Sequence, residues 1–383
     1  MLQVGLIQWM KLCGKFIMIK NVHIRGFKCF DDEVIDFSNL TVITGPNSSG
    51  KSSLIQAILL NLNFTNRSDR EIGEYLTSLG DFIDRKNKYV NPHSFIIKLC
   101  LNEGRACYYE ESVSGFKFNK ALESDIPSDN VYEWLQNAND VNTNIYSLYL
   151  SANRKAIEEK NDLGNNFIDG SPYCGINAQY IANYYYFHKE REVFIELRHP
   201  SAAANTLEAQ VNYWLSYVCD TELSLNVDKV TSTLYRAYYK IENQEYKPQN
   251  LGAGVSYLIA ILAKGLLMRT DVQEVFIIEN PEIHLHPKSQ ARLAEFFAFV
   301  ARTGRQIIIE THSEHLISKL RYCIYNKQIE ASQVVIQYRQ PDKFEKIEIL
   351  PNGKLLNETG EHSFPRGFFD ATLDNIFEIN SNV

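Results

Sequence analysis

Residues 45–52 read Gly-Pro-Asn-Ser-Ser-Gly-Lys-Ser, after the apolar run 40–44 and before a helix-like run over 53–60. The spacing G-x-x-x-x-G-K-[ST] between a buried strand and a helix is typical of a phosphate-binding loop. Its glycines let successive backbone N–H groups face one point, where the helix N-terminus adds partial positive charge. A chance match within a loop is the alternative, and the flanking strand and helix argue against it.

A phosphate-binding loop of this kind holds a nucleotide together with Mg²⁺. Its lysine reaches the β- and γ-phosphates, and the hydroxyl after the lysine holds the metal ion. Lys51 and Ser52 are expected to take these roles. The residues expected to surround the phosphates are Gly45, Pro46, Asn47, Ser48, Ser49, Gly50, Lys51, Ser52 and Ser53. The sequence therefore predicts a nucleotide site with Mg²⁺.

An acidic residue that could share this metal ion follows the apolar run 275–278, which ends in Glu279. In P-loop folds a strand that ends in an acid holds Mg²⁺ through water. We expect this strand to lie beside the strand that leads into the phosphate loop, with Glu279 as the metal-holding acid. A buried strand that happens to end in an acid is the alternative.

Two more patterns lie close to Glu279 in the sequence. Residues 250–256 place Gly252 and Gly254 at the start of a long apolar helix, which predicts a second anion-binding concavity. A flexible turn or a pair of helix-packing glycines would give the same pattern. Residues 308–313 place His312 just after the next strand, where it could donate a hydrogen bond to a γ-phosphate.

Three other groups of residues have functional interpretations that compete with structural ones. Histidines and acids near Glu279 suggest a zinc site, but two of them alternate along an extended segment, which disfavours it. The members of that group are Glu282, His284, His286, His312 and His315. The aromatic run 184–187, with cations nearby, could stack on a nucleic-acid strand, or could form a strand with its rings in the core. Arg154 could point toward the nucleotide or the subunit interface, or could form a surface ion pair.

Composition restricts the class of protein. The chain has 383 residues, 45% apolar, with a formal net charge of −7, which argues against a broadly basic nucleic-acid-binding coat. Its seven cysteines never form a C-x-x-C pair, as expected for reduced thiols of a cytoplasmic protein. The most apolar stretch, 255–268, is too short to span a membrane. Residues 1–17 lack the features of a signal peptide and are expected to be a leader of uncertain role.

Apolar periodicity predicts the elements that position these residues. Strands are expected at 19–24, 33–37, 40–43 and 146–151, with a strand pair over 94–101 and 105–110. Residues 202–240 show apolar residues at helical spacing. From 251 onward helices and strands alternate. This predicts an α/β head over 18–383, interrupted by an insertion at 111–249 that is helical at about 202–240.

The four motifs in this order resemble the ABC-type ATPase head shared by SMC proteins, RecF and the overcoming-lysogenisation-defect ATPases. Within that group, five segments closely resemble the AAA ATPases of bacterial antiphage defence systems such as Septu and PARIS. These segments are residues 24–30, 149–154, 280–287, 311–314 and 364–370. The resemblance implies an ABC-type P-loop head, a mixed sheet with flanking helices, carrying an inserted helical subdomain.

The resemblance also implies roles for individual residues. Residues 45–52 would be the Walker A motif, Glu279 the Walker B acid, His286 the D-loop residue and His312 the switch histidine. Asn280 stands where these ATPases place a catalytic glutamate, which puts fast hydrolysis in doubt. The implied signature motif comprises Gly252, Gly254 and Ser256, which would close over the nucleotide of a partner subunit.

The function implied is an ATP-binding, slowly hydrolysing ATPase. It would form a homodimer or higher oligomer around ATP and Mg²⁺, and regulate a separate effector protein such as a nuclease or toxin. A nucleotide-gated scaffold with little hydrolysis is the alternative, as is a RecF-like DNA-repair ATPase that binds DNA. The region between the phosphate loop and the glycine pair carries no sustained heptad pattern, so a long coiled-coil arm is not expected.

Overall fold

A computed structural model describes residues 18–65, 70–122, 145–162, 167–168, 171–231, 234–269 and 273–360. The expected leader at 1–17 and the motif at 364–370 lie outside these residues. Within the described ranges, no helix is long and apolar enough to cross a membrane.

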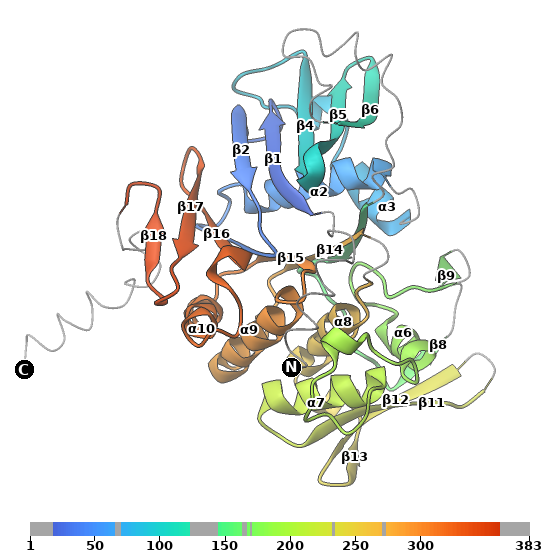
Figure 1. Ribbon diagram of the computed structural model, residues 1–383. Helices are drawn as coiled ribbons and strands as arrows, with labels where there is room; N and C mark the ends of the chain where they lie inside the picture. The colour runs from blue at the N-terminus through green and yellow to red at the C-terminus, as the bar shows by residue number, and fades with distance from the viewer. Residues whose placement is uncertain are drawn as a thin grey trace, which may run out of the picture.

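The largest sheet has seven strands and forms the centre of the protein (Figure 1). The five strands from β16 to β7 are parallel, whereas β17 and β18 pair antiparallel at one edge. The carboxyl ends of the parallel strands therefore share one side of the sheet. The order is β18 (Leu355–Asn357), β17 (Phe344–Ile349), β16 (Val334–Arg339), β3 (Leu40–Thr44), β15 (Gln306–Glu310), β14 (Gln273–Glu279) and β7 (Ile145–Leu150).

This strand order overturns one expectation. The acidic strand β14 does not lie beside β3, which leads into the phosphate loop, because β15 pairs with both and separates them. Both faces of a buried parallel strand are apolar, so the sequence of such a strand does not indicate which other strands pair with it. The strand next to the phosphate loop is therefore the one that ends in Glu310.

Alternating residues of the central strands pack into two separate hydrophobic cores. Ile307 and Ile309 of β15 belong to one core, and Ile308 to the other. Residues of β14 alternate in the same way, with Phe276 and Ile278 in the first core and Val275 and Ile277 in the second. The central sheet is therefore covered on both faces, as parallel sheets usually are.

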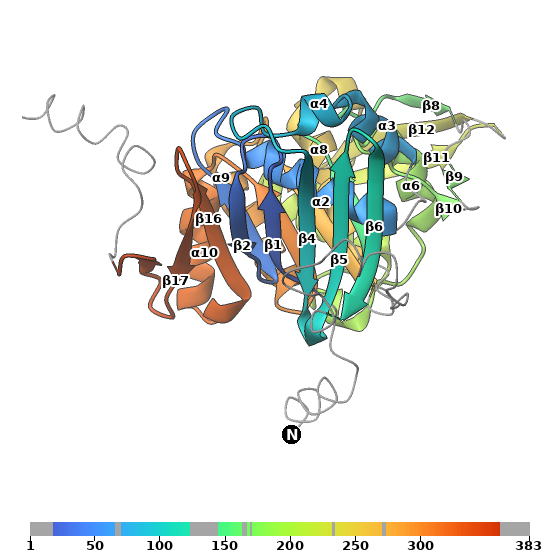
Figure 2. The same ribbon diagram turned by 90° about the horizontal axis from the view of Figure 1, so that it is seen from above.

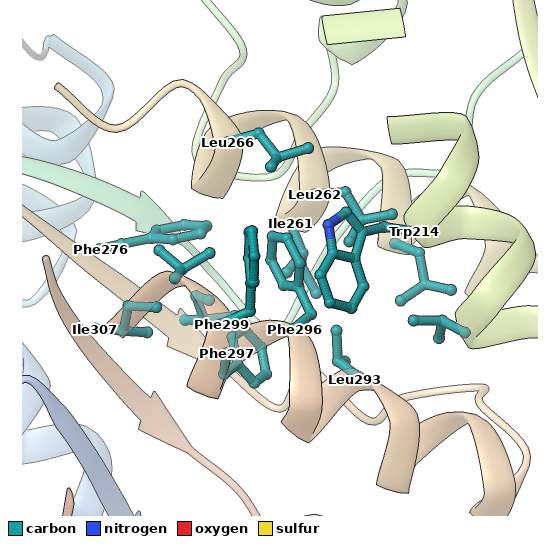
Figure 3. Close-up of a cluster of buried hydrophobic side chains, with 14 of the residues drawn as sticks. Trp214, Ile261, Leu262, Leu266, Phe276, Leu293, Phe296, Phe297, Phe299 and Ile307 are labelled. Carbon is teal, nitrogen blue, oxygen red and sulfur yellow. The ribbon is translucent and has the colours of Figure 1, made fainter. Parts of the chain in front are cut away.

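Helices cover the first face of the sheet: α7 (Leu207–Cys219), α8 (Ala253–Leu266), α9 (Pro287–Ala301) and α10 (Glu314–Tyr325). Figure 3 shows Trp214 of α7 pointing toward Phe296 of α9, with ring centroids 5.2 Å apart. Leu262 and Leu266 of α8 belong to the same cluster, which also contains Phe276 of β14. This packing holds the second half of α8 against the central sheet.

The second face is covered by α2 (Lys51–Thr65) and a five-stranded antiparallel sheet, which Figure 2 shows lying over that helix. The sheet order is β2 (Asp32–Asp36), β1 (Ile19–Arg25), β4 (Ser94–Leu101), β5 (Arg105–Ser112) and β6 (Gly115–Leu122). The expected strand pair at 94–101 and 105–110 is confirmed. Helices α3 (Arg70–Ser78) and α4 (Phe82–Arg85) lie between α2 and β4 in the chain.

The helix expected over 202–240 is wrong beyond Cys219. Asp220 adopts a left-handed φ of 57° and ends α7, and an antiparallel sheet follows. Its side chains alternate between buried and partly exposed positions along β11, a period of two rather than 3.6. This third sheet comprises β11 (Leu223–Lys229), β12 (Leu234–Ile241), β13 (Gln244–Tyr246) and β8 (Lys160–Asp162).

Residues 111–249 do not form one continuous insertion. Strand β6 extends the antiparallel sheet, and β7 is an edge strand of the central sheet. The aromatic run 184–187 lies on helix α6 (Ile181–His188) rather than on a strand, with Tyr185 fully buried.

The remaining short elements are β9 (Phe167–Ile168), β10 (Ser171–Pro172), η1 (Asn102–Gly104), η3 (Ile195–Leu197), η4 (Pro248–Asn250) and η5 (Ala331–Gln333). The mixed α/β class predicted for the chain is confirmed.

Candidate nucleotide-binding site

The phosphate loop joins β3 to α2 and needs glycine at both ends. Gly45 and Gly50 have φ values of 139° and 111°, which side chains rarely adopt. A Cβ at Gly45 would also come within 2.8 Å of the Arg339 carbonyl oxygen, and one at Gly50 would meet the Cys29 sulfur. Arg339 supports the loop from behind, since its Nε donates to the Ser49 carbonyl over 2.8 Å.

Lys51 and Ser52 lie at the first turn of α2, as predicted. The buried Lys51 ammonium donates to the carbonyls of Gly45 over 3.0 Å and Pro46 over 2.6 Å, so it points into the curl of the loop. Burial lowers the pKa of Lys51, and the charge of Glu310 opposes that shift. Ser52 is exposed and presents its hydroxyl to the pocket beside the loop.

This pocket, of about 530 Å³, brings together most of the predicted site. It is lined by Lys28, Cys29, Asn47, Ser48, Ser49, Gly50, Lys51, Ser52, Ser53, Ala152, Glu279, Asn280, Glu310 and His312. A larger pocket, of about 830 Å³, lies over α7 and β11 and contains none of the predicted residues. The smaller pocket is therefore the candidate site.

Glu279 ends β14 at the edge of this pocket, and its carboxylate is already hydrogen-bonded. The Tyr149 hydroxyl donates to Oε1 over 3.0 Å, and the Ala152 backbone N–H donates to Oε2 over 3.2 Å. Both partners come from β7 or the loop that follows it. Burial raises the pKa of Glu279, and these two hydrogen bonds oppose the shift.

Glu310 is the site residue that the sequence prediction missed. It ends β15, and its two carboxylate oxygens lie 3.3 and 3.2 Å from the Ser52 hydroxyl oxygen. The signal was present, because Glu310 follows the apolar run 307–309 just as Glu279 follows 275–278.

The two glutamates occupy paired positions on neighbouring strands. Burial raises the pKa of Glu310 to about 7, and the charge of Glu279 adds to the shift, while Lys51 and the Ser52 hydroxyl oppose it. Carboxylate and hydroxyl oxygens are the ligands that Mg²⁺ prefers, usually combined with phosphates and water. The donor set beside the phosphate loop therefore fits Mg²⁺ bound with a nucleotide.

Asn280 begins the turn after β14, and Arg154, from the segment after β7, donates hydrogen bonds to it. Asn280 has a φ of 44°, and its N–H donates to the Glu310 carbonyl over 2.7 Å. The Arg154 guanidinium is buried and donates to the carbonyls of Glu279, at 2.7 Å, and Asn280. The expected surface ion pair is therefore wrong, and Arg154 does not line the pocket. Arg154 instead holds the backbone that aims Glu279 and Asn280.

His312 lies just past β15 and lines the pocket, as predicted. Its backbone N–H donates to the Glu282 carboxylate over 2.8 Å. Burial lowers the pKa of His312, and the charge of Lys51 lowers it further. A neutral imidazole can donate one hydrogen bond to a phosphate oxygen while carrying no charge.

The predicted signature residues fall into two groups. Gly252 is exposed, and a Cβ there would meet no atom within 4 Å. Gly254 is buried against the turn after β14, since a Cβ would lie 2.5 Å from the His284 carbonyl oxygen. Ser256 is only 2% exposed, and its hydroxyl oxygen lies 3.3 Å from that of Tyr239. Ser256 therefore faces the core and does not fit a contact with another subunit.

The histidines considered as zinc ligands have other contacts. His286 caps α9, where its Nδ1 accepts from the Lys288 N–H over 3.3 Å, and the His284 ring lies 5.8 Å from that of Tyr257. In the part of the chain that the structure describes, no group of three or more His, Cys, Asp or Glu side chains is arranged to hold a metal ion.

Comparison with known proteins agrees with this geometry. The chain matches the family described as AAA ATPase domain over residues 18–201 and 116–317. It belongs to that family. An ATP-binding domain associated with ATP hydrolysis is therefore the level at which its function is established. No curated protein matches the chain at a significant level.

Solved structures are similar to the chain at low identity. The SMC head domain from Thermotoga maritima is 14% identical, with a TM-score of 0.45, and the match covers 88% of this chain and all of that one. The Smc head domain with a coiled coil and joint from Pyrococcus yayanosii is 10% identical, with a TM-score of 0.48, and the match covers 88% of this chain and 98% of that one. The recombination mediator RecF is 10% identical, with a TM-score of 0.45 and coverage of 87% and 98%.

Proposed function

We propose that this AAA ATPase-domain protein binds MgATP, hydrolyses it slowly, and dimerises around the nucleotide to regulate a partner effector. The observation that carries the proposal is the pocket in which Lys51, Ser52 and Glu310 meet Asn280 and His312. A phosphate-binding lysine, a metal-binding hydroxyl and a histidine aimed at the γ-phosphate are the parts that phosphoryl transfer requires.

Residues of this chain have separate roles in binding the nucleotide and in hydrolysis. Backbone N–H groups of residues 47–51 and the Lys51 ammonium bind the phosphates, and His312 donates to a γ-phosphate oxygen. Asn280, held by Arg154 through its carbonyl, orients the attacking water by hydrogen bonding. Mg²⁺ held near Ser52 would supply positive charge that offsets the charge of the phosphates. The carboxamide of Asn280 is a very poor proton acceptor, so the hydrolysis step is slow.

Dimerisation is supported by the start of α8. Gly252 is exposed with open space around it, yet it does not line the pocket of its own chain. A helix N-terminus with an accessible glycine is suited to bind an anion that approaches from outside. The γ-phosphate held by a second copy of this chain is such an anion, and a closed two-fold dimer would use both helices equally.

Slow hydrolysis also favours a second candidate, a nucleotide-gated scaffold that binds ATP and scarcely turns it over. The observation behind it is the carboxamide at position 280. Steady-state turnover of the purified protein separates the two candidates. A role in antiphage defence, with a nuclease or toxin as effector, rests on the sequence resemblance alone.

A DNA-binding role draws less support from the structure. The rings of Tyr184, Tyr185 and Tyr186 pack against the first hydrophobic core, and the Lys189 ammonium donates to the Val227 carbonyl over 3.1 Å. These groups are engaged within the protein. Strong stimulation of turnover by DNA, with a steep salt dependence, would restore the RecF-like alternative.

The test of the proposal is Lys51→Ala. Lys51 donates only to carbonyls of its own loop, so its loss opens no core cavity and the fold should persist. We expect ATP affinity to fall by at least about tenfold in a calorimetric titration, since one charge-assisted hydrogen bond contributes roughly 1.5–3 kcal/mol. Unchanged affinity in a folded variant would contradict nucleotide binding at this loop.

A further inference from the structure

We infer that Arg339 is a positioning residue of the nucleotide site, which fixes the phosphate loop relative to the turn between β1 and β2. The loop, residues 45–52, and this turn, residues 26–31, form two walls of the candidate pocket, the turn through Lys28 and Cys29. The inference rests on the proposed function and deepens it, because it names the side chain that keeps the pocket in shape to receive phosphates.

The first argument is the contact of Arg339 with the loop. Tyr338 pairs with Thr44, the last residue of β3, so Arg339 stands level with Gly45, where the loop begins. A Cβ on Gly45 would lie 2.8 Å from the Arg339 carbonyl oxygen, so the loop lies directly on the end of β16. The Arg339 Nε donates to the Ser49 carbonyl over 2.8 Å. Arg339 therefore contacts the loop near both of its ends.

The second argument is that the same guanidinium holds the turn. Its Nη1 donates to the Glu33 carboxylate over 3.0 Å, and its central carbon lies 5.3 Å from the centroid of the Phe30 ring. Cys29, next to Phe30, lines the pocket, and a Cβ on Gly50 would lie 2.4 Å from its sulfur. One side chain thus joins the two walls close to the point where they touch.

The third argument is the direction in which the loop presents its donors. Phosphate binding requires successive backbone N–H groups that face one point. In a planar trans peptide the carbonyl and the next N–H point in opposite directions, so fixing the Ser49 carbonyl on Arg339 turns the Gly50 N–H away from Arg339. Arg339 is 1% exposed, and its rigid guanidinium can hold a carbonyl and a carboxylate at once. The loop is therefore ordered before a nucleotide binds, which favours affinity.

The experiment replaces the buried pair as a unit, because removing one charge would leave the other buried without its partner. Arg339→Met combined with Glu33→Gln removes both charges with side chains of similar size. The new carboxamide oxygen at position 33 can still accept the Phe344 N–H, as the Glu33 carboxylate does. Neither Arg339 nor Glu33 lines the pocket, so the substitutions remove no direct contact with a nucleotide there.

The matched control is Arg305→Met combined with Glu196→Gln. Arg305 is 3% exposed, and its Nε donates to the Met268 carbonyl over 2.9 Å. Its guanidinium lies 4.0 Å from the Glu196 carboxylate, and neither residue lines the pocket. The control therefore removes a similar buried pair without touching the phosphate loop.

Two readouts are measured on the full chain: MgATP affinity by calorimetry, and the rate at which iodoacetamide labels Cys29 without nucleotide, followed by peptide mass spectrometry. In the Arg339→Met, Glu33→Gln protein we expect affinity to fall by about 5–30-fold, roughly the cost of ordering one backbone residue on binding. Labelling of Cys29 should become faster, because the turn separates from the loop. The control should keep both wild-type values even where its folding stability falls.

A wild-type value of either readout in the folded Arg339→Met, Glu33→Gln protein would overturn the inference, as would equal changes in the control. Arg339→Lys keeps a charge beside Glu33 but loses the planar fork, and it should shift both readouts in the same direction. It covers the case in which the paired variant fails to fold. Wild-type protein that binds no MgATP, with Cys29 labelling changed as expected, would refute the proposed function while supporting the role of Arg339, so the two failures are distinguishable.

Discussion

In the proposed hydrolysis of ATP, Asn280 would set the rate. Its left-handed φ of 44° and the two hydrogen bonds on its backbone hold it at the carboxyl end of β14. Asparagine tolerates this conformation better than most residues. The same backbone can therefore present a glutamate with moderate strain.

We predict that Asn280→Glu speeds ATP hydrolysis. A carboxylate can accept the proton of the attacking water, and general-base help is typically worth about 10²–10⁴-fold. Wild-type turnover should accordingly lie well below a typical enzyme rate of about 10 s⁻¹. Single-turnover measurements on both proteins test this. Fast wild-type turnover that Asn280→Glu leaves unchanged but Glu282→Gln abolishes would move the base to Glu282.

The raised pKa of Glu310 should make the free energy of unfolding depend on pH. Its pKa is raised in the folded protein from 4.5 to about 7, so the folded state binds the proton more tightly than the unfolded state. The loss of folding stability caused by ionised Glu310 is absent below about pH 4.5 and complete above about pH 7. Without nucleotide, Glu310→Gln should therefore gain stability relative to wild type between pH 5 and 8, by up to about 3 kcal/mol.

Urea unfolding of wild type and Glu310→Gln at several pH values measures this difference. Comparing the two proteins cancels the contribution of Glu33, whose pKa burial also raises. A pH-independent difference between the two proteins would contradict the shifted pKa of Glu310.

Helix α8 links the outward-facing glycine to the turn after β14. Gly254 packs against the His284 carbonyl, Tyr257 lies under the Arg154 guanidinium at 5.6 Å, and Lys264 donates to the Tyr149 carbonyl over 3.2 Å. Arg154 and Tyr149 in turn hold Glu279. A displacement of α8 by a partner subunit would therefore be transmitted to the acidic turn of the same chain.

Alanine substitutions of Gly252 and Gly254, at the start of α8, should have very different effects on folding stability. Gly254→Ala forces a Cβ to within 2.5 Å of a backbone oxygen, so we expect it to lose about 1–3 kcal/mol of stability. Gly252→Ala has open space and an ordinary φ of −60°, so its stability should change by less than about 0.5 kcal/mol. Chemical denaturation compares them, and equal losses would show that α8 does not pack on this turn as described.

The whole assembly can be tested by mixing subunits. Gly252→Arg should fold and load ATP on its own phosphate loop, yet block closure over a partner's nucleotide. Gly252 suits this test better than Ser256, because arginine at the buried Ser256 would disrupt the core. Each of Gly252→Arg and Lys51→Ala alone should lack activity, and their mixture should regain at most one composite site per dimer. Normal hydrolysis by either variant alone would contradict the shared site.

Local features of the chain could be predicted from sequence because they depend on neighbouring residues. The phosphate loop needs glycine where φ is positive, and the strands around it are apolar runs of strand length. The helix expected at 202–240 failed for a local reason, because the alternation beginning at Leu223 was masked by the helical spacing just before it.

Tertiary structure alone decided which side chains meet at the site. Strands β14 and β15 have similar apolar sequences that both end in glutamate, so only the packing of their connecting helices determines which one lies beside β3. The same packing turns Ser256 inward, leaves Gly252 outward and buries Arg154. Sequence therefore determined the chemistry of the phosphate loop, whereas the strand order, set by contacts between residues far apart in the chain, brought Glu310 to Ser52.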